Sequence, residues 1–232
     1  MRTVVFDLDG TLADTSGDLI AAANACFRDL GHPDMLDPAT DAATALRGGR
    51  AMLTLGFGRL GIPEADLAAH VDPQYQPLLV HYGRALAVHT TLYPGALAAV
   101  EALRAQGFAT VICTNKPEAL AEALMQALGV RDRFDSLIGA DTLPTRKPDV
   151  APFHAAIDRA GGHRDRAIMI GDTVTDHDTA RAAGVPSVLV SFGPAGKLPL
   201  DDMNPDAFLD HFDDLPALAE ALLPAAGAGQ GS

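Results

Sequence analysis

Apolar and polar residues follow different periods in different parts of this chain. Residues 3–6 form a short apolar run, which predicts a buried strand. Between about residues 16 and 88 apolar side chains recur every three or four positions, and no strand pattern interrupts them. The first such stripe consists of Leu19, Ala22, Ala23, Cys26, Phe27 and Leu30. This stretch therefore predicts helices at 17–30, 39–46, 49–60, 64–70 and 73–87.

After residue 93 helical and strand periods alternate. The pattern predicts helices at 96–106, 118–128, 150–159, 175–183 and 215–222, and strands at 109–114, 136–139, 167–170 and 187–190. Such alternation is typical of a parallel sheet with helices on both faces. The predicted fold class is α/β, with a Rossmann-like core at 1–14 and 90–224. A helical domain at 15–89 is inserted after the first strand, and 225–232 form a flexible tail rich in Ala and Gly.

The charge balance narrows the possible partners. Lys and Arg total 17 against 30 Asp and Glu, a formal net charge of -13, whereas a nucleic-acid surface needs clustered basic residues. Cys26 and Cys113 lie in apolar runs and do not form a disulfide framework. We find no leader pattern and no run of 18 apolar residues. The expected protein is cytoplasmic, with neither nucleic acid nor membrane as a partner.

Polar residues of distinctive type follow several predicted strands. Asp7 and Asp9 come after the first strand, and residues i and i+2 of a strand share a face. Two like charges about 4 Å apart repel by roughly 4 kcal/mol at an effective dielectric near 20, so this pair needs a cation or a shared proton. Thr114-Asn115 and Gly171-Asp172 follow later strands, and Lys147-Pro148 opens a helix. Because parallel strands end at one edge of a sheet, these residues are expected to converge there.

These motifs, in this order, resemble those of the haloacid dehalogenase-like superfamily of phosphotransferases. The matching segments are Asp7-Leu8-Asp9-Gly10-Thr11, Thr114-Asn115, Lys147-Pro148 and Gly171-Asp172-Thr173-Val174-Thr175-Asp176. Within the superfamily, Thr114-Asn115-Lys116-Pro117, Tyr93-Pro94-Gly95 and residues 180–186 are similar to the phosphoglycolate phosphatase subgroup. The resemblance covers the core nearly end to end and implies that the helical insertion is a cap domain.

The resemblance also implies a mechanism, the hydrolysis of a small phosphate monoester such as 2-phosphoglycolate. Asp7 would be the nucleophile that forms an aspartyl-phosphate, and Asp9 the general acid and base. A Mg²⁺ ion would neutralise the repulsion between substrate and nucleophile. The implied metal ligands are Asp7, Asp9 through its backbone carbonyl, Asp172 and Asp176, and the implied phosphate-binding residues are Thr114, Asn115 and Lys147. The partner would be a small phosphorylated metabolite, and the protein a monomer or a homodimer.

Simpler interpretations exist for single residues. Asp7 or Asp172 alone could cap a helix, Thr114 could be an ordinary strand residue, and Asp176 could serve a helix dipole. In the insertion, Arg47 and Arg50 are candidates for a substrate carboxylate or are solvated helix-end residues. Two other patterns do not indicate a binding site. Residues 56–61 match the dinucleotide-binding pattern GxGxxG but lie inside the helical stretch, and the histidines do not have the spacing of zinc ligands. His177 is expected on a helix surface.

Two alternative functions remain open. A sugar-phosphate mutase would share all four motifs and pass the phosphoryl group to a second sugar phosphate instead of water. A catalytically silent binding or regulatory module could keep the fold, although its signature would be loss of the nucleophile or of a metal carboxylate.

Overall fold

The computed structural model describes residues 1–193 and 202–225 and divides into two compact units. The first unit contains residues 1–13 and the chain from residue 92 onward, and the second contains residues 14–91. The chain crosses between them within the short strands β2 (Ala13–Asp14) and β3 (Thr91–Leu92), which pair with each other. Residues 226–232 of the expected tail lie outside the described part of the chain.

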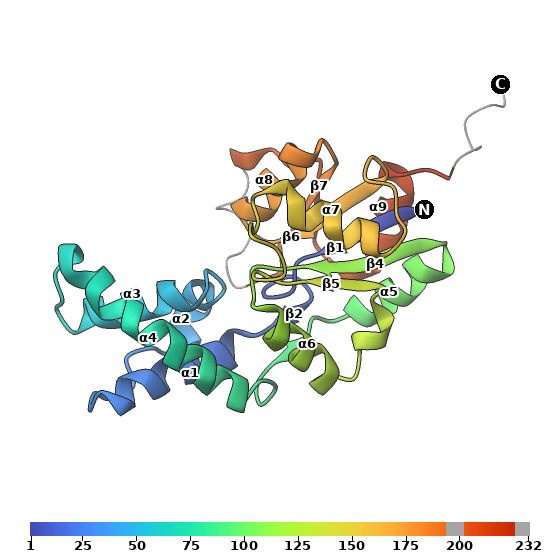
Figure 1. Ribbon diagram of the computed structural model, residues 1–232. Helices are drawn as coiled ribbons and strands as arrows, with labels where there is room; N and C mark the ends of the chain where they lie inside the picture. The colour runs from blue at the N-terminus through green and yellow to red at the C-terminus, as the bar shows by residue number, and fades with distance from the viewer. Residues whose placement is uncertain (194–201, 226–232) are drawn as a thin grey trace, which may run out of the picture. The chain divides into compact units, whose positions relative to one another are not determined.

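Among the residues that the structure describes, six strands form the central sheet of the first unit, in the order β5-β4-β1-β6-β7-β8 (Figure 1). They are β1 (Arg2–Phe6), β4 (Phe108–Cys113), β5 (Ser136–Ile138), β6 (Ala167–Gly171), β7 (Ser187–Val190) and β8 (Ala207–Leu209). Every neighbouring pair is parallel, and Val4 of β1 is in register with Thr110 on one side and Ile168 on the other. The α/β fold class is confirmed, and the residues that follow β1 emerge near the middle of the sheet's carboxyl edge.

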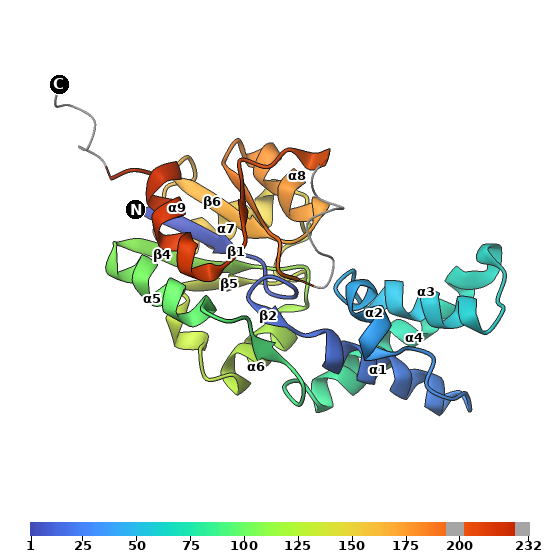
Figure 2. The same ribbon diagram turned by 180° about the vertical axis from the view of Figure 1, so that it is seen from behind.

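Helices cover both faces of this sheet. In the described part of this unit the α-helices are α5 (Ala96–Ala105), α6 (Glu118–Ala127), α7 (Val150–Arg159), α8 (Val174–Ala183) and α9 (Leu215–Leu222), and 3-10 turns lie at Arg131–Arg133 and Phe212–Asp214. Figures 1 and 2 show α7 and α8 on one face and α5 and α9 on the other. On the first of these faces Val5, Val111 and Met169 pack against Phe153 and Ile157 of α7, all fully buried. Burial on both faces explains why these strands read as continuous apolar runs.

The second unit contains four helices in residues 14–91, all of which the structure describes. They are α1 (Ser16–Asp29), α2 (Pro38–Ala45), α3 (Gly49–Arg59) and α4 (Glu64–Arg84). α1 contacts the other three, and Phe27 of α1 meets Phe57 of α3 edge-on at 5.1 Å between ring centroids. Gly56 lies against the Phe27 ring, so this glycine of the GxGxxG spelling permits close helix packing. Throughout residues 1–193 and 202–225, every helix is too short or too polar to span a membrane.

α4 is one continuous helix, and the prediction of two helices separated near residue 72 is wrong. It contains Pro73 and Pro77, each of which removes a backbone donor and costs about 3 kcal/mol in a helix interior. Val71, Leu78 and Tyr82 are buried at helical spacing along one face of α4. Packing of this face against α1 and α3 holds the helix together across both prolines.

Two further differences from the sequence prediction concern the first unit. β8 was not predicted from the local sequence, and its pairing with β7 determines it. His177, expected on a helix surface, is buried, and its Nδ1 lies 3.0 Å from Ser187 Oγ. The side of α8 that carries His177 faces β7, and the local sequence does not reveal this.

Candidate active site

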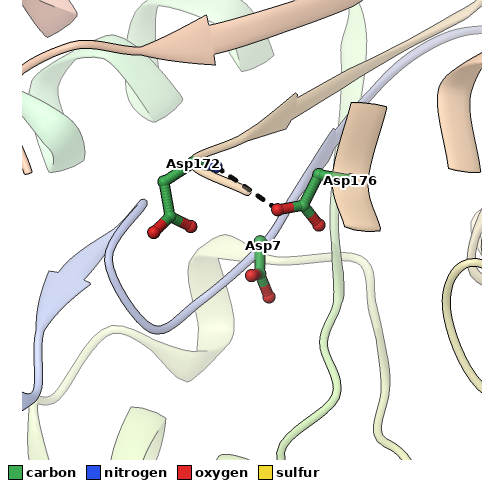
Figure 3. A group of neighbouring side chains, drawn as sticks. All are labelled: Asp7, Asp172 and Asp176. Atoms are coloured by element: carbon green, nitrogen blue, oxygen red, sulfur yellow. Dashed lines mark hydrogen bonds between the residues drawn. The ribbon is translucent and has the colours of Figure 1, made fainter. Parts of the chain in front are cut away.

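Three carboxylates gather at the carboxyl edge of the sheet, although they are far apart in the chain. Asp7 follows β1, Asp172 follows β6, and Asp176 lies in the first turn of α8 (Figure 3). Each offers an oxygen within 4.8 Å of the others, and all three residues are buried. The convergence expected from parallel strand ends is therefore present for these residues.

Hydrogen bonds at the start of α8 fix the orientation of the Asp176 carboxylate. Its Oδ2 accepts hydrogen bonds from the Thr173 hydroxyl at 2.7 Å and from the backbone N–H groups of Thr173 and Asp172 at 3.2 and 3.3 Å. Asp176 thus occupies the third position of a capping box at the start of α8. It serves the helix, as the simpler interpretation holds, and it also belongs to the acidic cluster. Gly171 allows this approach, because a Cβ there would lie 2.3 Å from Asp176 Cβ.

Lys147 lies among these carboxylates. Its Nζ is 3.1 Å from Asp7 Oδ1 and 2.5 Å from Asp176 Oδ1, and the side chain is almost fully buried. Burial by itself would lower the pKa of Lys147, but the carboxylates of Asp176 and Asp7 outweigh it and hold its pKa above the usual value. Lys147 is therefore a fixed positive charge beside Asp7.

The single positive charge of Lys147 does not balance the negative charges of the three carboxylates. Burial raises the pKa of Asp7 to about 6; Lys147 opposes the rise, and Asp176 adds to it. Burial, followed by the charges of Asp176 and Asp7, also raises the pKa of Asp172 well above its usual value. Asp7 Oδ1 is buried and accepts no well-directed hydrogen bond from the described residues. Three buried oxygen donors with excess negative charge suit a divalent cation that prefers oxygen ligands.

Asp9 makes a separate ion pair. Its two carboxylate oxygens lie 2.9 and 3.1 Å from the Nζ of Lys116, a buried lysine. The sequence prediction missed Lys116, although the scarcity of lysine and its place in Thr114-Asn115-Lys116-Pro117 were available signals. Thr11 was missed as well: its hydroxyl donates to Asp172 Oδ1 at 3.0 Å. Both residues support carboxylates that the sequence does identify.

The remaining candidates differ in their surroundings. Thr114 is buried, and its hydroxyl oxygen accepts from the Lys116 N–H at 3.2 Å. Asn115 is exposed, and its side-chain amide donates to the carbonyl oxygen of Lys147 at 3.0 Å, so it supports the Lys147 backbone. In the helical unit Arg50 is paired with Asp72 and lies over the Tyr75 ring at 4.7 Å, while Arg47 is exposed.

Comparison with known proteins assigns the family. The family model described as haloacid dehalogenase-like hydrolase matches residues 1–184. The chain belongs to the haloacid dehalogenase-like hydrolase family. The resemblance stated from the four motifs is thereby confirmed.

Several curated relatives of this haloacid dehalogenase-like hydrolase are named phosphoglycolate phosphatase. A phosphoglycolate phosphatase of Agrobacterium fabrum is 38% identical over 225 residues, covering 94% of this chain and 93% of the relative. A phosphoglycolate phosphatase of Mesorhizobium japonicum is 38% identical over 225 residues, covering 97% of each chain. These relatives belong to the subgroup that the sequence motifs resemble.

Solved structures share the fold across both units. A predicted phosphoglycolate phosphatase from Haemophilus somnus 129PT matches with a TM-score of 0.75 and 24% identity, covering 94% of this chain and 97% of that one. A predicted phosphatase from Clostridium acetobutylicum matches with a TM-score of 0.75 and 21% identity, covering 95% and 99%. At these identities the similarity establishes the fold alone.

Proposed function

We propose that this hydrolase is a Mg²⁺-dependent phosphoric monoester hydrolase that acts through an aspartyl-phosphate intermediate, with 2-phosphoglycolate as its substrate. The observation that carries the proposal is the placement of Lys147 between Asp7 and Asp176, beside Asp172, in one buried cluster. Such a cluster unites a nucleophile, a cation for phosphoryl oxygens and oxygen ligands for a metal. The relatives named phosphoglycolate phosphatase support the choice of substrate.

The metal site has a donor set of the right kind. Asp7, Asp172 and Asp176 would hold Mg²⁺, and the family resemblance adds the backbone carbonyl of Asp9. When bound, the ion supplies positive charge that offsets repulsion between the substrate and the nucleophile.

The protein's own residues attack the phosphorus atom, transfer the protons and bind the phosphoryl oxygens. An oxygen of Asp7 attacks phosphorus, and the bond from phosphorus to the ester oxygen breaks. Asp9, as an acid, gives its proton to the departing alkoxide; as a carboxylate it then takes a proton from the water that cleaves the aspartyl-phosphate. The Thr114 hydroxyl and the Lys147 ammonium bind the transferring oxygens, where negative charge develops. Asp7 is regenerated, and alcohol and phosphate leave.

The inserted helical unit is proposed to be the cap domain of this enzyme. In this role it excludes bulk water during phosphoryl transfer and contributes contacts to the leaving group. Arg47 is the cap residue proposed to recognise the carboxylate of 2-phosphoglycolate, because Arg50 is already paired with Asp72.

Release of inorganic phosphate tests the function directly. Purified protein is incubated with 2-phosphoglycolate and a panel of small phosphate esters, with Mg²⁺ or with EDTA, and kcat/KM is compared. The proposal expects steady, Mg²⁺-dependent release that is fastest from 2-phosphoglycolate. A sugar-phosphate mutase would instead convert one sugar phosphate to its isomer with little phosphate release, and a silent module would release none.

A further inference from the structure

Two buried lysines form ion pairs with different carboxylates at the carboxyl edge of the sheet. Lys147 contacts Asp7 and Asp176 of the acidic cluster. Lys116 contacts Asp9, with its Nζ 2.9 and 3.1 Å from the two carboxylate oxygens. The Lys116 side chain is only 4% exposed, so it is not a solvated surface lysine. A buried ammonium persists when an opposite charge offsets the cost of desolvation, and the Asp9 carboxylate supplies such a charge.

Backbone contacts fix the position of Lys116 itself. Its N–H donates to the Thr114 hydroxyl at 3.2 Å, and its carbonyl oxygen accepts from Ala140 N–H at 2.9 Å. The first contact attaches Lys116 to the segment after β4, and the second attaches it to the segment after β5. From this anchored backbone the side chain reaches across to the turn that follows β1.

Asp9 is fixed in its backbone by that turn. Gly10, with a φ of 83°, donates its N–H to Ala13 O at 2.9 Å, and the N–H groups of Leu12 and Ala13 donate to Leu8 O. The turn does not determine the two side-chain torsions of Asp9, whose side chain is 19% exposed. The Lys116 ammonium, within hydrogen-bond distance of both its oxygens, holds the carboxyl group at this place.

We infer that Lys116 is the positioning residue of Asp9, holding its carboxyl group in the place from which it exchanges protons with the leaving group and with water. This inference rests on the proposed function. In the first half-reaction the Asp9 O–H bond breaks, and its proton passes to the ester oxygen as the bond to phosphorus breaks. In the second, the Asp9 carboxylate receives a proton from the attacking water, which restores the acid. Both transfers require the carboxyl group in one place.

The dependence on leaving group separates this role from a structural one. The values of kcat/KM are measured for 2-phosphoglycolate, whose alkoxide needs a proton, and for acetyl phosphate, whose acetate departs without one. Since kcat/KM reports only the steps up to departure of the leaving group, the later reaction with water does not enter. Lys116→Met should lower the value for 2-phosphoglycolate by about 10- to 100-fold and that for acetyl phosphate by less than about threefold. Equal losses on both substrates would overturn the inference.

A second comparison does not depend on how well Lys116→Met folds. Asp9→Asn and Asp9→Asn/Lys116→Met both lack the Asp9 charge, and the double variant carries no unpaired buried charge. If Lys116 acts through Asp9, the two variants should agree within about twofold in kcat/KM for 2-phosphoglycolate. A further fall of more than about fivefold in the double variant would show that Lys116 acts directly and would contradict the inference.

A matched control measures the effect of losing an unrelated ion pair. Arg104 contacts Asp135 at 2.8 Å and the Thr110 hydroxyl at 3.2 Å, in the same β-sheet unit. Arg104→Met should lower kcat/KM equally for both substrates, if at all. If the wild-type protein releases phosphate from neither 2-phosphoglycolate nor acetyl phosphate, the proposed function is refuted. This outcome is distinct from the equal losses that would refute the role of Lys116.

Discussion

At the residue scale, the chemistry depends on a few charges held out of water. Asp7 and Asp172 are buried next to each other's charge, and burial is the largest cause of their raised pKa values. Lys147 offsets part of this charge through direct contact with Asp7. Such an arrangement is unfavourable by itself, and perturbed groups of this kind concentrate at functional sites. The site is therefore built for a ligand that brings positive charge.

Replacing Asp7, the proposed nucleophile, should abolish turnover. Asp7→Asn keeps the shape of the side chain but removes the attacking carboxylate, so kcat for 2-phosphoglycolate should fall by at least about 1,000-fold. The matched control is Asp178→Asn, an exposed position in α8, which should retain the wild-type rate. Phosphate release and protein phosphorylation are measured on both variants. Activity within tenfold of wild type in Asp7→Asn would refute the proposed chemistry.

At the element scale, the second unit is held together by particular contacts between helices. Asp41 of α2 and Arg59 of α3 form a two-point ion pair, with N–O distances of 2.6 and 2.7 Å, and the Asp41 side chain is only 5% exposed. Asp41 also accepts from Asp37 N–H at 2.8 Å. A pair of this geometry contributes more than an ordinary surface pair because the carboxylate is shielded from water.

Removing the Asp41 charge should destabilise the protein. Asp41→Asn should lower the free energy of unfolding by about 2 kcal/mol at pH 7, whereas Asp34→Asn, which breaks the exposed pair with Arg28, should cost less than about 0.5 kcal/mol. The hydrogen bond from Arg59 lowers the pKa of Asp41 in the folded state. The stabilisation is therefore lost as the pH falls through this lowered pKa. Urea unfolding at pH 7 and near pH 3 tests both points. An equal cost for the two variants would contradict the prediction.

Glycines in α3 provide a test of helix packing. A Cβ at Gly56 would lie 2.2 Å from Cζ of Phe27, whereas a Cβ at Gly58 meets no atom within 4 Å. Gly56→Ala should therefore destabilise the protein by about 1–3 kcal/mol through overpacking. Gly58→Ala should stabilise it by about 0.5–1 kcal/mol through helix propensity. Thermal unfolding of the two variants should shift in opposite directions; a rise in both midpoints would show that α1 and α3 tolerate a closer contact.

At the scale of the whole molecule, the protonation of Asp7 is linked to the free energy of unfolding. Burial raises the pKa of Asp7 to about 6 in the folded protein from the usual 3.8 of an aspartate, so the folded state binds the proton more tightly. The stability that this proton contributes is present below pH 4 and is lost as pH rises through about 6. Without divalent metal, Asp7 should therefore make the folded protein less stable at pH 7 than at pH 4, by up to about 3 kcal/mol.

Unfolding in EDTA isolates this contribution. The difference in unfolding free energy between wild type and Asp7→Asn is measured at pH 4 and at pH 7, and Asp7→Asn should gain relative stability at pH 7. Addition of Mg²⁺ should stabilise wild type more than Asp7→Asn, because Asp7 is one of the proposed ligands of the ion in the folded state. A relative stability that does not change with pH would show that Asp7 titrates normally.

The chain by itself determined the fold class and the edge of the sheet at which Asp7 and Asp172 meet. Alternating apolar strands and amphipathic helices require a layered parallel sheet, because each element must bury its apolar side. Parallel strands end at one edge, and for this reason Asp7 and Asp172 could be placed together from sequence order alone. The repulsion between neighbouring carboxylates indicated a cation or a shared proton, and the resemblance of the four motifs to the family implied a phosphoryl group.

Tertiary structure decided what local pattern does not encode. Packing of a buried face keeps α4 continuous through Pro73 and Pro77, where the local signal predicts a break. Pairing with β7 creates β8, and the docking of α8 buries His177. The Lys116–Asp9 pair spans 107 positions, and no local periodicity reports such a contact. Burial and long-range pairing depend on which surfaces meet in three dimensions, so only the folded chain assigns Lys116 and Lys147 their carboxylates.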